Sequence, residues 1–309
     1  MDNNIIAPSF ATDQRIVVSQ GDALEVLKEL PDAHFRLAVS SPPYNIGKEY
    51  EKKVCMQEYL QWQSDILKEV VRVVSKDGSI VWQVGNFVDK GEVFPLDIFL
   101  YPILKSLGLQ LRNRIIWHYA HGLHNTKRFS GRYETLLWFT KSDDYVFHLD
   151  PVRIPSKYPG KRHYKGPKKG QPSGNPLGKN PSDYWEILQQ EWETGILDVP
   201  NVKANHPEKT EHPCQFPIEL IERCVLAFTH EDDWVLDPFG GVGSSVIAAI
   251  KNGRRGMMID QDPGYVTMAR NRITAFQEGK LKIRPMGKPI YQPRPSDKTS
   301  QLPPEWDSI

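Results

Sequence analysis

Cysteine, net charge and long apolar runs are all scarce in this chain. Its 309 residues include three cysteines, Cys55, Cys214 and Cys224, which lack metal-ligand spacing. Three are too few for a disulfide framework and fit a reducing compartment. Lysine and arginine number 39 against 38 acidic residues, which leaves a net charge of +1. Any nucleic-acid contact must therefore depend on where the charges lie along the chain and not on their sum.

No apolar stretch is long enough to cross a membrane, and the first residues, Met-Asp-Asn-Asn, are polar. We therefore expect no signal peptide, no membrane contact and a cytoplasmic location. The histidines His118, His121 and His124 are spaced by three, which is compatible with ligation on a helix. Because Gly122 interrupts them and no carboxylate is adjacent, the sequence favours a polar loop over a pocket and no metal site.

Segments with strand and helix periodicity alternate along most of the chain. Strands are expected at residues 15–19, 35–40, 79–84, 111–117, 132–140, 234–236 and 256–259, and helices at 23–30, 58–74, 93–107, 182–192, 218–227 and 246–252. This alternation predicts an α/β fold with a mostly parallel sheet covered by helices on both faces. The length allows one large α/β domain with an insertion, or two domains.

The most distinctive stretch is residues 37–48, in which an apolar run stops at Ser41-Pro42-Pro43-Tyr44. Proline cannot donate to a sheet ladder, so the strand must end at Ser41. Proline also holds the preceding residue extended, which fixes the direction of the Ser41 oxygens and the Pro42 carbonyl. Rigid acceptors beside the ring of Tyr44 suit a planar group that carries an amine. An ordinary loop is the equal alternative for these four residues alone.

A glycine loop lies far downstream, between a strand and a helix. The strand ends in Asp237-Pro238-Phe239, the glycines are Gly240, Gly241 and Gly243, and the next strand ends at Asp260. Glycines permit a tight turn and close approach of a ligand, and the terminal acid is placed to bind ribose hydroxyls. The loop lacks the dinucleotide fingerprint and the Lys-Ser or Lys-Thr of a phosphate-binding loop. It therefore favours a nucleoside-bearing ligand without a polyphosphate.

Asp22 stands where the first expected strand hands over to the first helix. Ligands of open α/β sheets gather at the carboxyl ends of strands, which makes Asp22 a candidate binding acid. A helix cap is the equal alternative.

The composition changes at about residue 150. Between residues 150 and 180, eight basic residues stand against the single acid Asp150: Arg153, Lys157, Lys161, Arg162, Lys165, Lys168, Lys169 and Lys179. Glycines, prolines and aromatic residues are interleaved with them. Such a segment favours contact with nucleic acid, because the cations neutralise phosphates while the flexible backbone follows a groove. A solvated linker between domains is the alternative.

Together, Ser41-Pro42-Pro43-Tyr44 and the stretch from Asp237 to Ser244 resemble the two signature motifs of DNA amino-methyltransferases that use S-adenosylmethionine. The catalytic motif comes first and the cofactor loop last, which is similar to the permuted beta group of bacterial restriction-modification or orphan methyltransferases. The resemblance covers Val17 to about Ala275. It implies a Rossmann-like methyltransferase fold with circularly permuted motif order. It divides the chain into a catalytic half (1–149), a target-recognition region (150–210), a cofactor-binding half (211–280) and a tail (281–309).

The resemblance also implies roles for single residues, with Ser41, Pro42, Pro43 and Tyr44 as the catalytic set. The expected cofactor-binding residues are Asp22 near the adenine, Pro217 and Glu219 beside the methionine end, Asp237, Phe239, Gly240, Gly241, Gly243 and Ser244 at the loop, and Asp260 at the ribose. The expected DNA-binding residues are Lys48, Lys157, Lys161, Arg162, Lys165, Lys168 and Lys169. The implied cofactor is S-adenosylmethionine and the implied partner is double-stranded DNA, with a homodimer frequent in the group.

The implied reaction methylates an exocyclic base amine, a poor nucleophile whose lone pair is delocalised into the ring. The base is flipped, Ser41 and the Pro42 carbonyl accept from its NH2, Tyr44 stacks on it, and the methyl arrives in line from the sulfonium. No metal or covalent cysteine is required.

Two features of the sequence indicate different target bases: Ser41, the first residue of the corner, and the residues that follow the corner. Members with Ser at this position are often cytosine-N4 enzymes, whereas Asn45-Ile46-Gly47-Lys48 and Tyr50 resemble the continuation in adenine members. The sequence favours adenine N6, with cytosine N4 as the alternative. A non-catalytic DNA-binding protein and an RNA or protein methyltransferase are the remaining alternatives.

Overall fold

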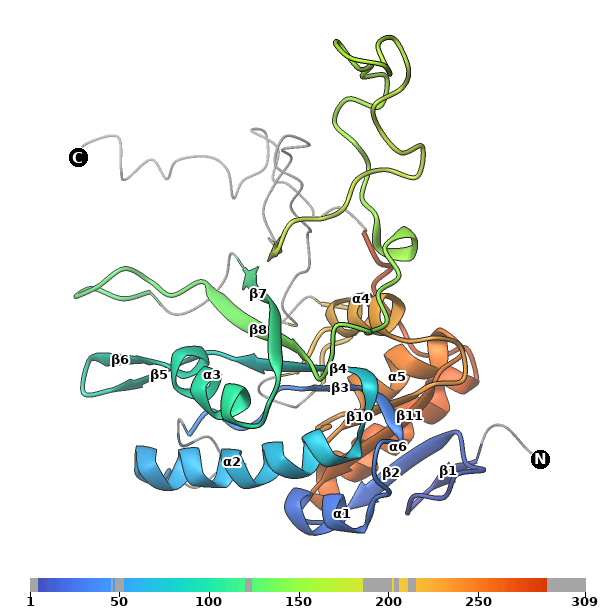
Figure 1. Cartoon of the computed structure of the whole chain (residues 1–309). Coiled ribbons are helices and arrows are strands. Elements are labelled where there is room, and N and C mark those ends of the chain that lie inside the picture. The colour runs from blue at the N-terminus through green and yellow to red at the C-terminus, as the bar shows by residue number, and fades with distance from the viewer. Residues whose placement is uncertain are drawn as a thin grey trace, which may run out of the picture.

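The computed structural model describes residues 5–45, 47, 53–119, 124–185, 202, 206–210 and 215–287. Their main sheet contains β1 (Ile6–Ala7), β2 (Ile16–Gln20), β3 (Phe35–Ser40), β4 (Val74–Val84), β7 (Gln110–His118), β8 (Tyr133–Thr140), β9 (Tyr184–Trp185), β10 (Trp234–Asp237) and β11 (Arg255–Asp260). The strand order is β1-β2-β11-β10-β3-β4-β8-β7-β9 (Figure 1). Only β8 runs against its neighbours β4 and β7, so the described sheet is mixed but mostly parallel, as predicted.

Helices cover both faces of this sheet. One face carries α1 (Ala23–Glu29), α2 (Met56–Val73) and α3 (Leu96–Ser106), and the other carries α4 (Ile218–Phe228), α5 (Ser244–Lys251) and α6 (Pro263–Gln277). Successive residues of β3 serve opposite faces, because strand side chains alternate. Leu37 and Val39 pack with α4, α5 and α6, whereas Ala38 packs with α1, α2 and α3. Both faces of the strand are buried, which explains its unbroken apolar run.

Strands from the two ends of the chain lie side by side at the centre of the sheet. β10 pairs in parallel with β3, with Val235 opposite Leu37 and Leu236 opposite Ala38. Parallel pairing places the carboxyl ends of both strands at the same edge. The Ser-Pro-Pro-Tyr corner and the glycine loop, which follow these two strands, therefore emerge together.

A small hairpin precedes α3, where the sequence predicted helix from residue 93. β5 (Asn86–Asp89) and β6 (Glu92–Pro95) pair antiparallel, and the two turn residues are Lys90 and Gly91. Both have positive φ, 47° and 91°. Two such residues in a two-residue loop are typical of a type I′ turn, which closes a hairpin. The helix prediction was therefore too long at its start.

Other segments also differ from the sequence-based expectations. Tyr184–Trp185, predicted as helical, form β9 and pair in parallel with Ile116 and Trp117 of β7. Residues 186–192 of that predicted helix lie outside the described residues. The α6 helix was not predicted; Asp262 caps it by accepting from the backbone N–H groups of Gly264 and Tyr265.

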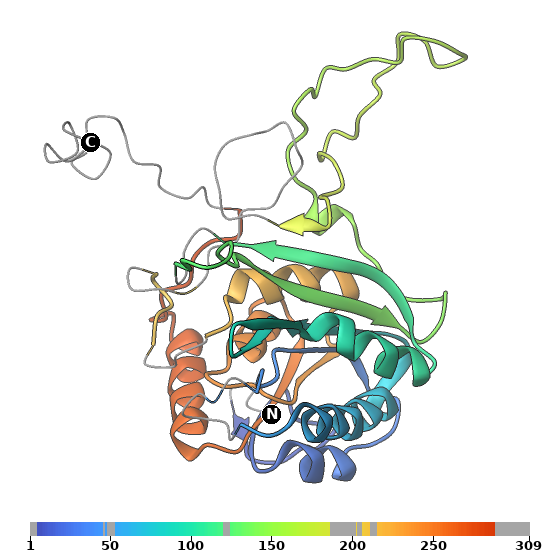
Figure 2. The same ribbon diagram turned by 90° about the vertical axis from the view of Figure 1, so that its left-hand side faces the viewer.

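The basic loop, residues 155–179, projects from the body of the molecule (Figure 2). At its base, Ile154 and Lys179 form an isolated antiparallel bridge, and further out Arg162 bridges Pro172. Across the described part of the chain, no helix combines the length and apolar character that a membrane span needs.

Candidate active site

The Ser-Pro-Pro-Tyr corner turns back on itself directly after β3. Ser41 Oγ lies 2.9 Å from Tyr44 Oη, and Tyr44 Oη donates to Glu134 Oε2 at 3.1 Å. Glu134 comes from β8, the reversed strand two places away from β3 in the sheet. The tyrosine hydroxyl is therefore held by its own corner on one side and by a distant strand on the other.

A buried chain of polar side chains fixes the main chain of the corner. Tyr59 Oη, on α2, donates to the Pro43 carbonyl at 3.0 Å. Gln63 Nε2 donates to Tyr59 Oη at 3.1 Å, and Trp82 Nε1 donates to Gln63 Oε1 at 3.1 Å. Tyr59, Gln63 and Trp82 are at most 2% exposed. Fully hydrogen-bonded buried polar groups specify one geometry, so this network favours a single main-chain conformation at the corner.

Asn45 and Gly85 complete the setting of Tyr44. Asn45 adopts a positive φ of 60° and exchanges two 2.8 Å hydrogen bonds with the backbone of Val54, which ties the corner to the start of α2. A Cβ at Gly85 would lie 3.0 Å from Tyr44 Cε2. The glycine therefore lets the tyrosine ring lie against the backbone after β4. Sequence reasoning identified neither residue as part of the site.

Asp237 ends β10 and joins the glycine loop to the corner. Its Oδ1 accepts from Ser40 Oγ at 2.5 Å and from the Phe239 backbone N–H at 3.1 Å. The residue is 2% exposed, and this burial raises the pKa of Asp237 to about 6. The Ser40 hydrogen bond connects residues 197 positions apart in the sequence. The two motifs thus form one constellation.

The glycine loop needs its glycines for two different reasons. Gly243, which precedes α5, has a φ of 79°, a left-handed conformation that glycine adopts without strain. Gly240 lies so close to β11 that a Cβ would sit 2.5 Å from Met258 Cβ. Ser244 begins α5, is buried, and accepts from Arg272 Nη1 at 3.3 Å.

Asp260 closes the loop from the neighbouring strand. Its Oδ2 accepts from the Gly241 backbone N–H and its Oδ1 from that of Asp262, both at 2.9 Å. Burial raises the pKa of this carboxyl, although both backbone bonds oppose the shift. Each carboxylate oxygen keeps a further lone pair, so Asp260 can still accept from a ligand.

Phe239 connects the loop with the helix behind the corner. Its ring lies 5.4 Å from that of Trp62 on α2 and 6.2 Å from that of Trp82 on β4. Aromatic pairs at these separations add to the stability of the packing. Asp237, Phe239, Gly241 and Asp260 therefore lie beside the Ser-Pro-Pro-Tyr corner, and the cofactor contacts expected of them stay predictions.

Comparison with known proteins shows the family of the chain. The model of a family described as DNA methylase (N6_N4_Mtase) matches residues 35–271. The chain belongs to this DNA methylase family. It is 45% identical over 267 residues to the type II methyltransferase M.BglII of Bacillus subtilis, with 86% of this chain and 71% of the relative covered.

Solved structures show the same fold. The Thermus thermophilus protein TTHA0409, complexed with S-adenosyl-L-methionine, is 26% identical and matches with a TM-score of 0.56 over 82% of this chain and 91% of its own. The cytosine-N4-specific PvuII DNA methyltransferase matches with a TM-score of 0.63, over 85% of this chain and 91% of its own. At 20% identity it shows the fold alone. The predictions of a methyltransferase fold and of membership among S-adenosylmethionine-dependent DNA amino-methyltransferases are confirmed.

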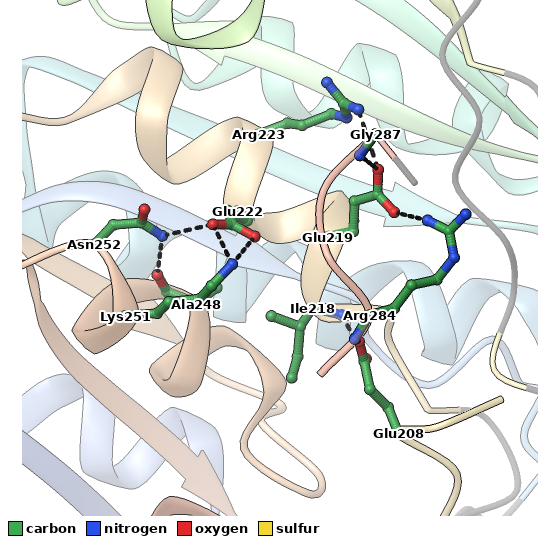
Figure 3. A network of polar contacts seen from close by, with 10 residues as sticks. All are labelled: Glu208, Ile218, Glu219, Glu222, Arg223, Ala248, Lys251, Asn252, Arg284 and Gly287. Carbon is green, nitrogen blue, oxygen red and sulfur yellow. Dashed lines mark hydrogen bonds and ion pairs between the residues drawn. The ribbon is translucent and has the colours of Figure 1, made fainter. Parts of the chain in front are cut away.

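In this methylase, Glu219 lies in a buried polar network (Figure 3). Its carboxylate accepts from Arg223 at 3.1 Å, from Arg284 at 2.5 Å and from the Gly287 backbone N–H at 2.7 Å. Glu208 accepts from the backbone N–H groups of Ile218 and Arg284 at 3.0 and 3.1 Å. Pro217 directly precedes α4. The network shows what Glu219 does within the chain, and the cofactor contact expected of Glu219 and Pro217 stays a prediction.

The remaining predicted residues of the methylase lie outside this centre. Asp22 caps α1, accepting from the Leu24 and Glu25 backbone N–H groups at 2.9 and 3.2 Å, so the cap interpretation holds while the adenine contact stays a prediction. Six of the predicted DNA-binding residues lie on the basic loop: Lys157, Lys161, Arg162, Lys165, Lys168 and Lys169. Lys48 and His121 lie outside the described residues.

Proposed function

We propose that this methylase transfers a methyl group from S-adenosylmethionine to the exocyclic amine of a base flipped out of duplex DNA. The observation that carries the proposal is the 2.5 Å hydrogen bond from Ser40 to Asp237. It joins the strand that ends at the amine-accepting corner to the strand that ends at the glycine loop. A nucleoside-bearing donor and a planar amine can therefore be held next to each other.

The hydrogen-bond acceptors at the glycine loop fit the proposed cofactor. Asp237 and Asp260 stand at the carboxyl ends of two adjacent parallel strands, where carboxylates can accept from an ammonium group or from ribose hydroxyls. When bound, the cofactor supplies an electrophilic methyl on a sulfonium. Gly240, Gly241 and Gly243 allow the tight turn that such a ligand requires, and Phe239, whose ring contacts Trp62 of α2, would border the cofactor.

The corner would act on the nucleophile. Ser41 Oγ and the Pro42 carbonyl accept the two amine hydrogens, which orients the nitrogen and increases its electron density as the N–C bond forms. The electron pair of the C–S bond would remain with the sulfur, and the methylated nitrogen would release its surplus proton to water. Tyr44 stacks on the flipped base, with its hydroxyl fixed by Ser41 and Glu134.

The basic loop would hold the DNA. Its cations lie on a segment that projects from the body (Figure 2). There they can reach DNA phosphates beyond the sheet edge that carries the corner and the glycine loop. We infer the same division of the chain as from the sequence: catalytic half, target-recognition region, cofactor-binding half and tail. Adenine N6 over cytosine N4, a homodimer and a cytoplasmic location stay predictions.

Nucleoside analysis of DNA from cells that express the protein tests the proposal. We expect N6-methyladenine or N4-methylcytosine above the level in matched cells that express Tyr44→Ala, and the same analysis distinguishes the two bases. Modification-sensitive sequencing then gives the recognition site. Labelled methyl that reaches RNA or protein but not duplex DNA would overturn the proposal.

A further inference from the structure

Glu134 is an acid that no motif identifies, yet its carboxylate ends at the catalytic corner. Oε2 accepts from Tyr44 Oη at 3.1 Å and from Gln83 Nε2, and Oε1 accepts from Tyr119 Oη at 3.4 Å. The strand register fixes the position of Glu134. Glu134 lies opposite Trp117 of β7, and the next residue, Thr135, lies opposite Val84 of β4. The carboxylate therefore receives groups from three segments of the chain.

The chain of contacts from Glu134 to Ser41 has one consistent direction. An ionised carboxylate can only accept, so Tyr44 must give its single hydroxyl hydrogen to Glu134. Ser41 Oγ lies 2.9 Å from the same tyrosine oxygen, and the hydrogen between them must then come from Ser41. With its hydrogen committed to Tyr44, Ser41 Oγ presents lone pairs to the substrate.

We propose that Glu134 is a positioning residue that, through Tyr44, makes Ser41 a hydrogen-bond acceptor toward the target base. The inference rests on the proposed function. A serine hydroxyl alone can donate as well as accept, so Ser-Pro-Pro-Tyr by itself does not distinguish an amine from a carbonyl. Glu134 removes that ambiguity, because reversing the chain would require the carboxylate to donate.

The consequence is a rule for which base edge the corner admits. Ser41 Oγ and the Pro42 carbonyl both accept, which suits the two hydrogens of an NH2 group. A carbonyl oxygen at the same place would face two acceptors with no donor, an unsatisfied arrangement that costs binding. Glu134 thereby favours adenine or cytosine over their keto counterparts, hypoxanthine and uracil.

A purely structural role for Glu134 predicts something different. The carboxylate would then hold Tyr44, Gln83 and Tyr119 together, and its loss would lower stability or turnover equally for every base. The ratio of affinities for amine and keto bases separates these roles. This ratio comes from dissociation constants measured in the presence of S-adenosylhomocysteine. The duplexes are unmethylated, carry the recognition sequence and differ only in the target base.

Glu134→Leu is the informative substitution, because it removes both acceptor oxygens at a similar size, whereas an amide oxygen could still accept from Tyr44 and Gln83. We expect the wild-type protein to prefer the amine duplex by about tenfold or more, and Glu134→Leu to lose most of this preference. Tyr44→Phe, which breaks the chain in the middle and keeps the aromatic ring, should lose it likewise. The control is Glu92→Gln, an exposed acid on β6, which should keep the wild-type ratio.

A double-mutant comparison tests whether Glu134 acts through Ser41. Ser41→Ala should lower the ratio, and adding Glu134→Leu should change it no further, because the serine that Glu134 orients is gone. The idea is overturned if Glu134→Leu keeps the wild-type ratio while binding cofactor normally, or if the two substitutions reduce the ratio independently. Methyl transfer by the wild-type protein tests the proposed function separately, since the ratio requires no turnover.

Discussion

Two regions of the molecule are built in opposite ways: the sheet edge that carries the Ser-Pro-Pro-Tyr corner and the glycine loop, and the basic loop. At the edge, the contacts are long-range and buried: Asp237 is 2% exposed and accepts from Ser40, 197 residues away. In the basic loop, the contacts are local, such as Arg162 Nη1 donating to the Gly170 carbonyl at 2.7 Å. Its tyrosine Tyr164 is 83% exposed. The sheet edge is thus held by contacts across the core, whereas the basic loop, the proposed DNA-binding surface, is bridged by contacts between its own residues.

This difference teaches where substitutions should act. A substitution at the edge disturbs buried charges and the hydrogen bonds that join the corner to the glycine loop. Its effect on stability or cofactor binding should therefore be large. A change in the basic loop removes one exposed cation, so it should be small and should affect only DNA binding. Five expected outcomes test that contrast, in decreasing order of effect.

Arg284→Ala should cost the most stability. The substitution leaves the buried carboxylate of Glu219 without the partner that lies 2.5 Å away, and breaking a buried ion pair typically costs about 3–5 kcal/mol, so we expect roughly that loss. Urea unfolding monitored by tryptophan fluorescence measures it. Lys280→Ala removes one partner of the exposed pair with Glu278 and should leave the midpoint unchanged. Equal effects of the two substitutions would mean that burial of the Glu219–Arg284 ion pair adds nothing to its contribution to stability.

Asp237→Ala should abolish cofactor binding at micromolar concentrations. Loss of a buried charge-assisted acceptor costs about 3 kcal/mol, which corresponds to a dissociation constant raised by roughly 100-fold. Calorimetry with S-adenosylmethionine measures this constant directly. A variant that is folded and binds the cofactor as the wild type does would disprove the assignment of Asp237.

The same carboxyl should leave a mark on the pH dependence of stability. Burial raises its pKa from 3.8 in the unfolded chain to about 6, so the folded state binds the proton more tightly. The wild type should therefore lose stability relative to Asp237→Asn as pH rises through this window, by roughly 3 kcal/mol, and the difference should be constant above it. Chemical unfolding of both proteins at several pH values measures the difference. Parallel curves would show that the carboxyl does not titrate there.

Tyr44→Ala should impair turnover without affecting the cofactor. Stacking of a base on an aromatic ring is worth about 1–3 kcal/mol, so kcat should fall about 10- to 100-fold. The dissociation constant of S-adenosylmethionine should stay at the wild-type value. A variant with normal methylation rate would mean that the ring does not hold the base.

Alanine at Lys161, Lys165, Lys168 and Lys169 should have the mildest effects, each weakening DNA binding less than about tenfold. Together they should flatten the salt dependence of the DNA affinity, by about 0.9 in logarithmic slope for each phosphate that is no longer neutralised. Fluorescence anisotropy with duplex DNA at several salt concentrations measures the slope. Lys76→Ala, an exposed lysine on β4, is the control. An unchanged slope in the quadruple variant would remove the basic loop from the DNA interface.

The sequence predicted those parts of the site that depend on local chemistry. Two prolines stop β3 wherever it lies, and glycines with a terminal acid mark a ligand loop in any parallel sheet. The alternation of apolar segments likewise predicted most strands and helices. These features require no knowledge of which strands are neighbours.

The missed parts depend on neighbours that are distant in sequence. Glu134 is the second residue of β8, and nothing in the neighbouring sequence indicates that its carboxylate accepts a hydrogen bond from Tyr44, 90 positions earlier. Tyr184–Trp185 became a strand because β7 offered a free edge there, a tertiary choice that local periodicity does not reveal. The Lys90-Gly91 turn was overlooked because apolar residues come soon after it, as at the start of a helix.

The pairing of β3 with β10 has a consequence for how the protein is made. A ribosome releases the Ser-Pro-Pro-Tyr corner early, but its strand gains the neighbour β10 only after the intervening segment, including the basic loop, has been synthesised. Contacts of such high sequence separation form late, because the long loop must close before they contribute. The N-terminal portion of a nascent chain would therefore contain the Ser-Pro-Pro-Tyr corner before β10, the strand that pairs with β3, has been made. Premature termination before residue 237 would yield inactive protein.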